Sequence, residues 1–123
     1  MNEYIQFGCG LCAPPGWRNF DVSPTLRLQR LPLIGSRLHG KNIPFFPANA
    51  EYGDIVEGLP VPFKSCRAVY CSHVLEHLAL DDFRIALKNV YACLQDGGVF
   101  RFVVPDLEIL ARNYLGSPEA DAS

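Results

Sequence analysis

The chain has 123 residues, of which 49% are apolar, and its formal net charge is −2. This length fits one domain with one hydrophobic core, and the apolar content predicts folding rather than disorder. The charge gives no reason to expect nucleic acid or an anionic membrane surface as partner, because both bind basic patches. No run of 18 apolar residues and no basic segment followed by an apolar stretch occurs, so we expect neither a membrane span nor a secretory signal.

Five cysteines are present, and most of them lie inside apolar runs. An odd number in such positions indicates buried, reduced thiols, which are typical of a cytoplasmic protein. Residues 9–12 spell Cys-Gly-Leu-Cys, a spacing also found in redox and zinc sites. Because no second pair of this kind exists, we interpret the spacing as incidental.

Two short strands are expected near the start, at residues 4–7 and 17–22. The residues between them are too few and too rich in proline and glycine for a crossover helix, so a loop or a single helical turn must connect the strands. Ser23 and Pro24 suit the cap and first position of a helix. A third strand is expected near residues 54–56.

The second half of the chain predicts strands and helices in alternation. In order, we expect a buried strand at residues 66–72, a helix capped by Asp81 or Asp82 and running to about residue 95, a strand at 99–105, and a further helix from Asp106. Gly97 and Gly98 are the expected stop signal of the first of these helices. Apolar strands alternating with helices predict an α/β fold, with a parallel sheet flanked by helices.

Ligands of such sheets bind at the carboxyl ends of the strands. Four places qualify in this sequence: residues 8–10, Asp21, Asp54 and residues 72–73. A Gly-x-Gly bend lets a ligand lie against bare backbone, and an acidic residue ending the second strand can accept both hydroxyl protons of a ribose. Each signal is weak alone, and their regular order along the chain is what points to a nucleotide-like ligand.

Residues 73–77 also contain His-x-x-Glu-His, a spelling found in zinc proteases. His73 directly follows a predicted strand, so His73 and His77 need not lie on one helix face. A zinc hydrolase would also need a third ligand from elsewhere, and we therefore do not expect a metal site here.

Three segments together resemble class I S-adenosylmethionine-dependent methyltransferases, closest to a small bacterial type with a shortened first connection. They are YIQFGCG…GWRNFDVSP, GDIVEGLPVPFKSCRAVYCSHVLEHL and ALKNVYACLQDGGVFRFVVPDL, and they span residues 4–107. The resemblance implies a Rossmann-like parallel sheet of about five strands, truncated relative to the seven strands of the family. Residues 1–123 would form a single domain that either is a minimal version or belongs to a longer protein.

The resemblance also implies roles for individual residues. Those matching the cofactor-binding positions are Gly8, Cys9 and Gly10 under the methionine part, Asp21 at the ribose, Asp54 and Ile55 at the adenine, and Ser72 and His73 near the transferred methyl group. Two positions depart from the family pattern, because Gln6 replaces an acidic residue and Cys12 replaces a third glycine.

Methyl transfer needs a general base only when the acceptor must lose a proton. His73 is the candidate base, with Asp106 behind it, although Asp106 suits a helix cap equally well. The resemblance suggests a small metabolite or a sugar-containing intermediate as acceptor.

The alternative is a degenerate methyltransferase-like module that binds or interacts without catalysis. A homodimer contact or the terminal helix is expected to cover the open edge of the fifth strand.

Overall fold

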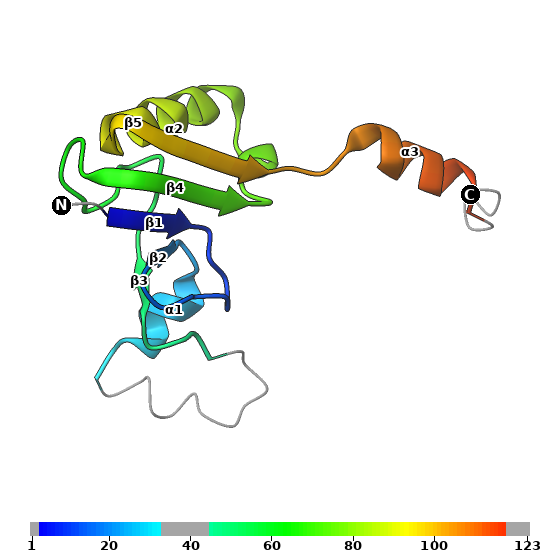
Figure 1. The fold of residues 1–123 in the computed structure, drawn as a ribbon. Coiled ribbons are helices and arrows are strands. Elements are labelled where there is room, and N and C mark those ends of the chain that lie inside the picture. Colours follow the sequence, from blue (N-terminus) through cyan, green and yellow to red (C-terminus); the bar gives the residue numbers. More distant parts are fainter. Residues whose placement is uncertain (1–2, 33–44, 118–123) are drawn as a thin grey trace.

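The computed structural model describes residues 3–32 and 45–117, and these build one parallel sheet (Figure 1). Its five strands lie in the order β3-β2-β1-β4-β5, and all four neighbouring pairs are parallel. The strands are β1 (Glu3–Phe7), β2 (Arg18–Asp21), β3 (Ala50–Tyr52), β4 (Cys66–Ser72) and β5 (Leu94–Val103). The predicted α/β, Rossmann-like fold with five strands is therefore confirmed.

The α-helices are α1 (Pro24–Gln29), α2 (Leu80–Cys93) and α3 (Leu107–Leu115), and a short 3-10 helix, η2, spans Leu75–His77. The helix α1 lies between β2 and β3, and α2 lies between β4 and β5, whereas turns and loops join β3 to β4 and, as expected, β1 to β2. Pro24 opens α1 as predicted, because its fixed φ suits the first helical position. Within the described residues, none of these helices has both the length and the apolar character needed to cross a membrane.

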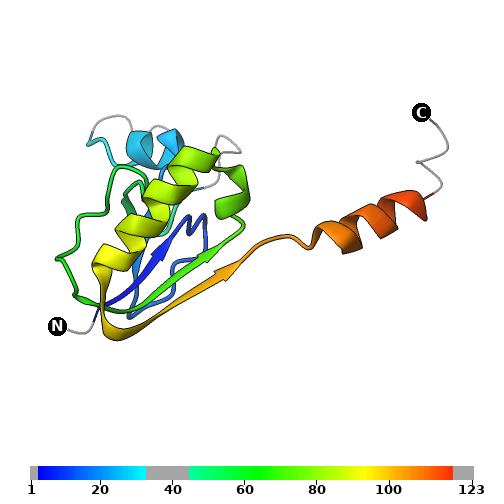
Figure 2. The same cartoon turned by 90° about the horizontal axis from the view of Figure 1, so that it is seen from above.

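The core lies between α2 and one face of the sheet. Side chains from the middle strands pack there against Ala86 and Val90 of α2, and the strand residues involved are Ile5, Phe7, Phe20, Val69 and Cys71. Because strand side chains alternate between faces, the residues between these point to the opposite face. Figure 2 shows α2 lying across the sheet. A smaller cluster under α1 contains Cys9, Leu26, Phe46 and Ala50.

The third strand was predicted in the wrong place. Residues 54–56 form a turn, in which the Asp54 carboxylate accepts a hydrogen bond from the Val56 amide at 2.8 Å and the Gly58 amide donates to the Asp54 carbonyl. The strand is β3, which pairs with β2 through Asn19–Ala50 and Asp21–Tyr52. Such local side-chain bonding to the backbone favours turns over strands.

Both ends of α2 also differ from the prediction. The helix starts after Ala79, whose carbonyl accepts the first helical hydrogen bond from Phe83, so Asp81 and Asp82 lie in the first turn. Acidic side chains there stabilise the positive end of the helix without capping it. The helix ends at Cys93, and β5 begins at the next residue instead of after the two glycines.

The last helix, α3, leaves the sheet on an extended segment, as both ribbon views show (Figures 1 and 2). Asp106 caps it, with its carboxylate accepting a hydrogen bond from the Ile109 amide at 3.2 Å. None of the residues of α3 is buried. The terminal helix therefore does not lie along β5, which was one of two ways of covering that edge.

Candidate functional site

Three strands end side by side at the carboxyl edge of the sheet. Because β1 lies between β2 and β4, the bend that follows β1 at Gly8 has Asp21 on one side and Ser72 on the other. The parallel arrangement brings these positions together although they are far apart in the sequence. This edge is where ligands of open α/β sheets bind.

The bend and the aspartate are directly bonded. Gly10 donates its amide to Asp21 Oδ2 at 2.8 Å, and the Ser23 amide donates to Asp21 Oδ1 at 2.9 Å. Gly8 and Gly10 have φ angles of 66° and 56°, which residues with a Cβ rarely adopt. Each carboxylate oxygen still has a second lone pair for a ligand donor. Asp21 thus shapes the bend and keeps acceptor capacity.

Gly8 has a second reason to lack a side chain. A Cβ at this position would lie 2.3 Å from Cγ2 of Val74, far inside van der Waals contact. Val74 follows His73 and precedes η2, so the absence of a side chain at Gly8 lets the segment after β4 approach the segment after β1. The bend after β1 and the end of β4 can therefore form two walls of one site.

A hollow of about 340 Å³ lies between these walls. Its lining contains three of the predicted residues, Gly8, Cys9 and Ser72, together with Gln6, Cys12 and Tyr70. Tyr70 was missed by the sequence analysis, and Gln6 and Cys12 were noted only as departures from a pattern. Gln6 and Tyr70 each stand two positions before a predicted site residue, so the period of two along a strand could have identified them.

Gln6 is buried and oriented by one hydrogen bond. Its Nε2 donates to the Cys12 carbonyl at 2.8 Å, and only 8% of the residue is exposed. No hydrogen bond to Gln6 Oε1 forms within the described part of the chain. The amide therefore presents an acceptor oxygen where the resemblance implied a carboxylate.

Asp54 and Ile55 lie beside Asp21 and outside the hollow. The Asp21 carbonyl accepts a hydrogen bond from Gly53 at 3.1 Å, which holds the turn after β3 against the end of β2. Asp54 is half-buried, whereas the Ile55 side chain packs into the core. Asn89 of α2 donates a hydrogen bond to the Ile55 carbonyl at 2.7 Å and so anchors this turn to α2. No sequence pattern indicated that role of Asn89.

Ser72 and His73 form a pair at the end of β4. Ser72 Oγ lies 2.9 Å from Nδ1 of His73, and the His73 amide donates to the Val103 carbonyl of β5. His73 is exposed and has a φ of 57°, a strained conformation that often occurs at functional sites. Asp106 bonds the α3 backbone, and no hydrogen bond joins it to His73 in the described structure.

The positive φ of His73 also bears on whether the His-x-x-Glu-His motif of residues 73–77 can bind zinc. His73 precedes η2, whereas His77 ends it, so the two side chains do not share a continuous helix. Within residues 3–32 and 45–117, no group of three or more His, Cys, Asp or Glu side chains is arranged to hold a metal ion.

Burial, together with the charge of Asp21, raises the pKa of the Cys9 thiol to about 11. Cys9 therefore stays protonated near neutral pH and lacks the thiolate needed for redox exchange.

A parallel sheet with a glycine bend after its first strand and a carboxylate ending its second defines a Rossmann-like domain, of the kind that binds nucleotide cofactors. A model of the family described as "Methyltransferase domain" matches residues 26–102, more than half of the chain. The chain belongs to this family, which comprises class I S-adenosylmethionine-dependent methyltransferases. No curated protein matches the chain. The glycine bend and Asp21 precede the matched residues, so their assignment depends on the geometry described above.

Proposed function

We propose that this chain binds S-adenosylmethionine at the carboxyl edge of the sheet and transfers its methyl group to a small-molecule or sugar-containing acceptor. The observation that carries the proposal is the bond between the Gly10 amide and the Asp21 carboxylate, next to the hollow at the end of β1. Family members typically bind this cofactor. The five free cysteines suit the reducing cytoplasm, where we place the protein, and we propose a bacterial source.

The groups present at this edge fit the parts of the cofactor. Asp21 has free lone pairs for ribose hydroxyls, and the bend of Gly8, Cys9 and Gly10 offers bare backbone to the methionine part. Gln6 Oε1 can accept a hydrogen bond from the amino group of the cofactor. On the far side of Asp21, we assign the adenine to Asp54 and Ile55, which lie in the turn that follows the neighbouring strand β3. The hollow alone has a volume within the range of small-molecule sites.

When bound, the cofactor supplies a methyl group on a good leaving group, so the protein must chiefly hold the acceptor in line with it. His73 is our candidate base for an acceptor that must lose a proton. In the tautomer whose Nδ1–H donates to Ser72 Oγ, Nε2 carries the free lone pair and can take that proton. Ser72 then sets the tautomer and the ring orientation. Asp106 remains a second catalytic candidate, with capping of α3 as its observed role.

Calorimetric titration with S-adenosylhomocysteine tests the cofactor site. We expect the unmutated chain to bind and Asp21→Ala to bind at least about tenfold more weakly, a difference of about 1.4 kcal/mol. Asp96→Ala is the matched control, because the Asp96 side chain is 95% exposed and pairs with Lys64 at the opposite end of the sheet. Circular dichroism checks that both variants fold. Absence of binding by the unmutated chain at millimolar ligand would reject the proposal.

A degenerate, non-catalytic module is the second candidate. It is favoured by Gln6, since an amide cannot offer a charge to the cofactor's amino group. If S-adenosylhomocysteine binds but no methyl transfer is detected across a panel of hydroxyl, amine and carboxylate acceptors, this candidate takes precedence. A substitution of His73 would then leave ligand affinity unchanged and have no activity to abolish.

We also propose that a homodimer contact covers the outer edge of β5. This strand pairs only with β4 among the described strands, and unpaired edges are usually covered in natural proteins. The exposed apolar residues of α3, among them Leu107 and Leu115, add surface that a second copy can bury. Light scattering coupled to size exclusion should give twice the mass of the chain. A monomer at high micromolar concentration would contradict the proposal.

A further inference from the structure

Within residues 3–32 and 45–117, no helix covers the middle strands on the face of the sheet opposite α2. The loop between β1 and β2 replaces a crossover helix, so the side chains of β1, β4 and β5 on this face are left partly open. A second hollow of about 480 Å³ lies there. The lining residues that matter for its chemistry are Gln6, Trp17, Tyr70, Val99 and Arg101.

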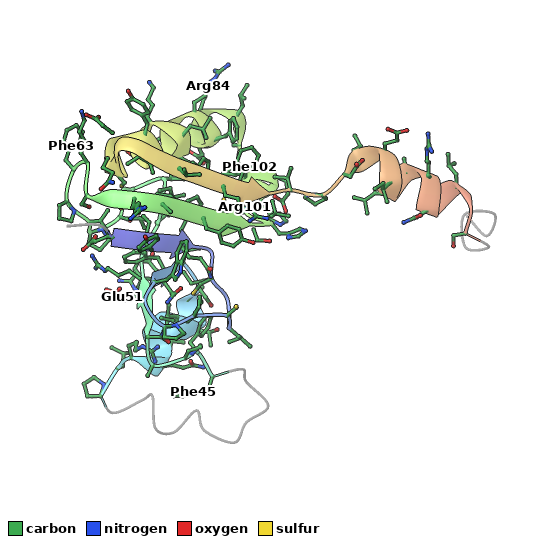
Figure 3. All side chains as sticks on the ribbon, in the orientation of Figure 1. Phe45, Glu51, Phe63, Arg84, Arg101 and Phe102 are labelled. Carbon is green, nitrogen blue, oxygen red and sulfur yellow. The ribbon has the colours of Figure 1, made fainter. Side chains whose placement is uncertain are left out.

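This second hollow adjoins the first. Gln6 and Tyr70 line both, so a molecule placed here lies next to the hollow assigned to the cofactor. The side chains alternate along β5, with Phe102 facing α2 and Arg101 facing the second hollow. Both residues are labelled near the carboxyl end of β5 in Figure 3. The position is therefore suited to an acceptor that must reach a methyl group in the neighbouring hollow.

Arg101 gives the second hollow its charge preference. Its guanidinium is exposed and has no acidic partner among the residues that the structure describes. An unpaired guanidinium binds carboxylates and phosphates through two parallel hydrogen bonds. By contrast, the Arg18 guanidinium already binds the Glu51 carboxylate through two hydrogen bonds. Arg101 is thus available to hold an anionic ligand.

Trp17 and Tyr70 give the hollow its shape preference. Trp17 comes from the short loop and packs on Tyr4, with ring centroids 5.4 Å apart, which fixes the indole at the rim. Tyr70 lies on β4, the strand between β1 and β5, and together with the exposed Val99 it adds apolar surface to the hollow. Flat aromatic ligands stack well on such side chains. One end of the hollow therefore suits a ring and the other an anion.

We propose, on the basis of the function proposed above, that this hollow is the acceptor subsite and takes a small molecule that joins an aromatic ring to a carboxylate or a phosphate. Arg101 binds the anionic group, and Trp17 and Tyr70 hold the ring. Gln6 lies at the boundary with the cofactor hollow, so the atom to be methylated faces that side.

Trp17 is the only tryptophan of the chain, so its fluorescence reports directly on the hollow. We would titrate phenylacetate, phenyl phosphate and the uncharged phenylacetamide, with and without saturating S-adenosylhomocysteine. Phenylacetate or phenyl phosphate should change the emission and bind at least about tenfold more tightly than phenylacetamide, as expected for a charge-assisted contact. The anion that binds more tightly identifies the carboxylate or the phosphate as the natural group.

Arg101→Gln should weaken binding of the anions about tenfold and leave that of phenylacetamide and S-adenosylhomocysteine unchanged. Arg84→Gln is the matched control, because Arg84 lies on α2 and projects away from the sheet (Figure 3). Equal affinities for phenylacetate and phenylacetamide, or no effect of Arg101→Gln, would overturn the subsite while calorimetry still detects S-adenosylhomocysteine. Loss of that cofactor binding in the unmutated chain would instead overturn the proposed function, and the acceptor role with it.

Discussion

Gly8→Ala perturbs the contact between the two walls of the site, and its cost can be worked out from two separate effects. The first is the φ of 66°, which costs a residue with a Cβ about 1–2 kcal/mol. The second is the approach to Val74, where the new Cβ would lie 2.3 Å from Cγ2. Relieving such overpacking typically costs about 1–3 kcal/mol, because the β-branched Val74 has few alternative rotamers. We expect a total loss of about 2–5 kcal/mol in the free energy of unfolding.

Gly10→Ala separates the two effects. Gly10 has a similar φ of 56°, but nothing lies within 4 Å of the position that a Cβ would take. This variant should lose only about 1–2 kcal/mol, the cost of the backbone conformation. Urea unfolding followed by circular dichroism measures both variants, and equal slopes would show that the midpoints can be compared directly.

Val74→Ala removes Cγ2 and completes a double-mutant cycle with Gly8→Ala. The clash disappears in the double variant, so we expect a favourable coupling energy of about 1–3 kcal/mol. Displacing Val74 also shifts the adjacent His73, so Gly8→Ala should bind S-adenosylhomocysteine more weakly than Gly10→Ala. If Gly8→Ala proved no more destabilising than Gly10→Ala, or if the coupling were zero, the close approach of the two walls would be refuted.

Further measurements follow from the same site and from the buried thiols. Gln6→Glu should tighten S-adenosylhomocysteine binding about tenfold in calorimetry, because a carboxylate can pair with the amino group of the ligand. The variant loses the hydrogen bond to the Cys12 carbonyl, so its free energy of unfolding should fall by about 1–3 kcal/mol. Weaker binding would contradict the assigned role of Gln6. Iodoacetamide followed by mass spectrometry should label Cys12, the one exposed cysteine of the five, much faster than Cys9. Burial raises the pKa of Cys71 to about 12 and that of Cys93 to about 11, so the folded chain keeps protons that the unfolded chain loses above pH 9.0. The free energy of unfolding should therefore fall above that pH by up to about 1.4 kcal/mol per pH unit for each thiol, and Cys71→Ala should lessen the slope.

The elements that the sequence predicts correctly have local signatures. The strands β1 and β4 consist mainly of apolar residues and lie inside the sheet, and Pro24 marks the start of α1 by its own geometry. The strand β3 has no such signature, because its three residues, Ala-Glu-Tyr, become a strand only by pairing with β2. The end of α2 was misplaced for a similar reason, since β5 continues directly from Cys93 into pairing with β4.

In the site, too, features with a local sequence signature were predictable, whereas features that depend on contacts between distant segments were not. Asp21 and the glycine bend were predictable, because each depends on residue type and on position at a strand end. Nothing in the sequence indicates that Gly8 must be small because of Val74, since their contact depends on how the segments after β1 and β4 meet. The bond from Asn89 to the turn at Ile55 likewise joins elements that only the folded chain brings together.

One feature of the sequence, the short connection between β1 and β2, determines much of the chemistry of this fold. A crossover helix there would cover the open face of the sheet and bury Tyr70 and Arg101. The loop instead leaves this face open and places Trp17 at its rim, against Tyr4. It also supplies the Cys12 carbonyl that orients Gln6 between the two hollows. The same ten or so residues that shorten the domain thus bring the aromatic ring, the buried amide and the exposed guanidinium of the proposed acceptor subsite to one surface.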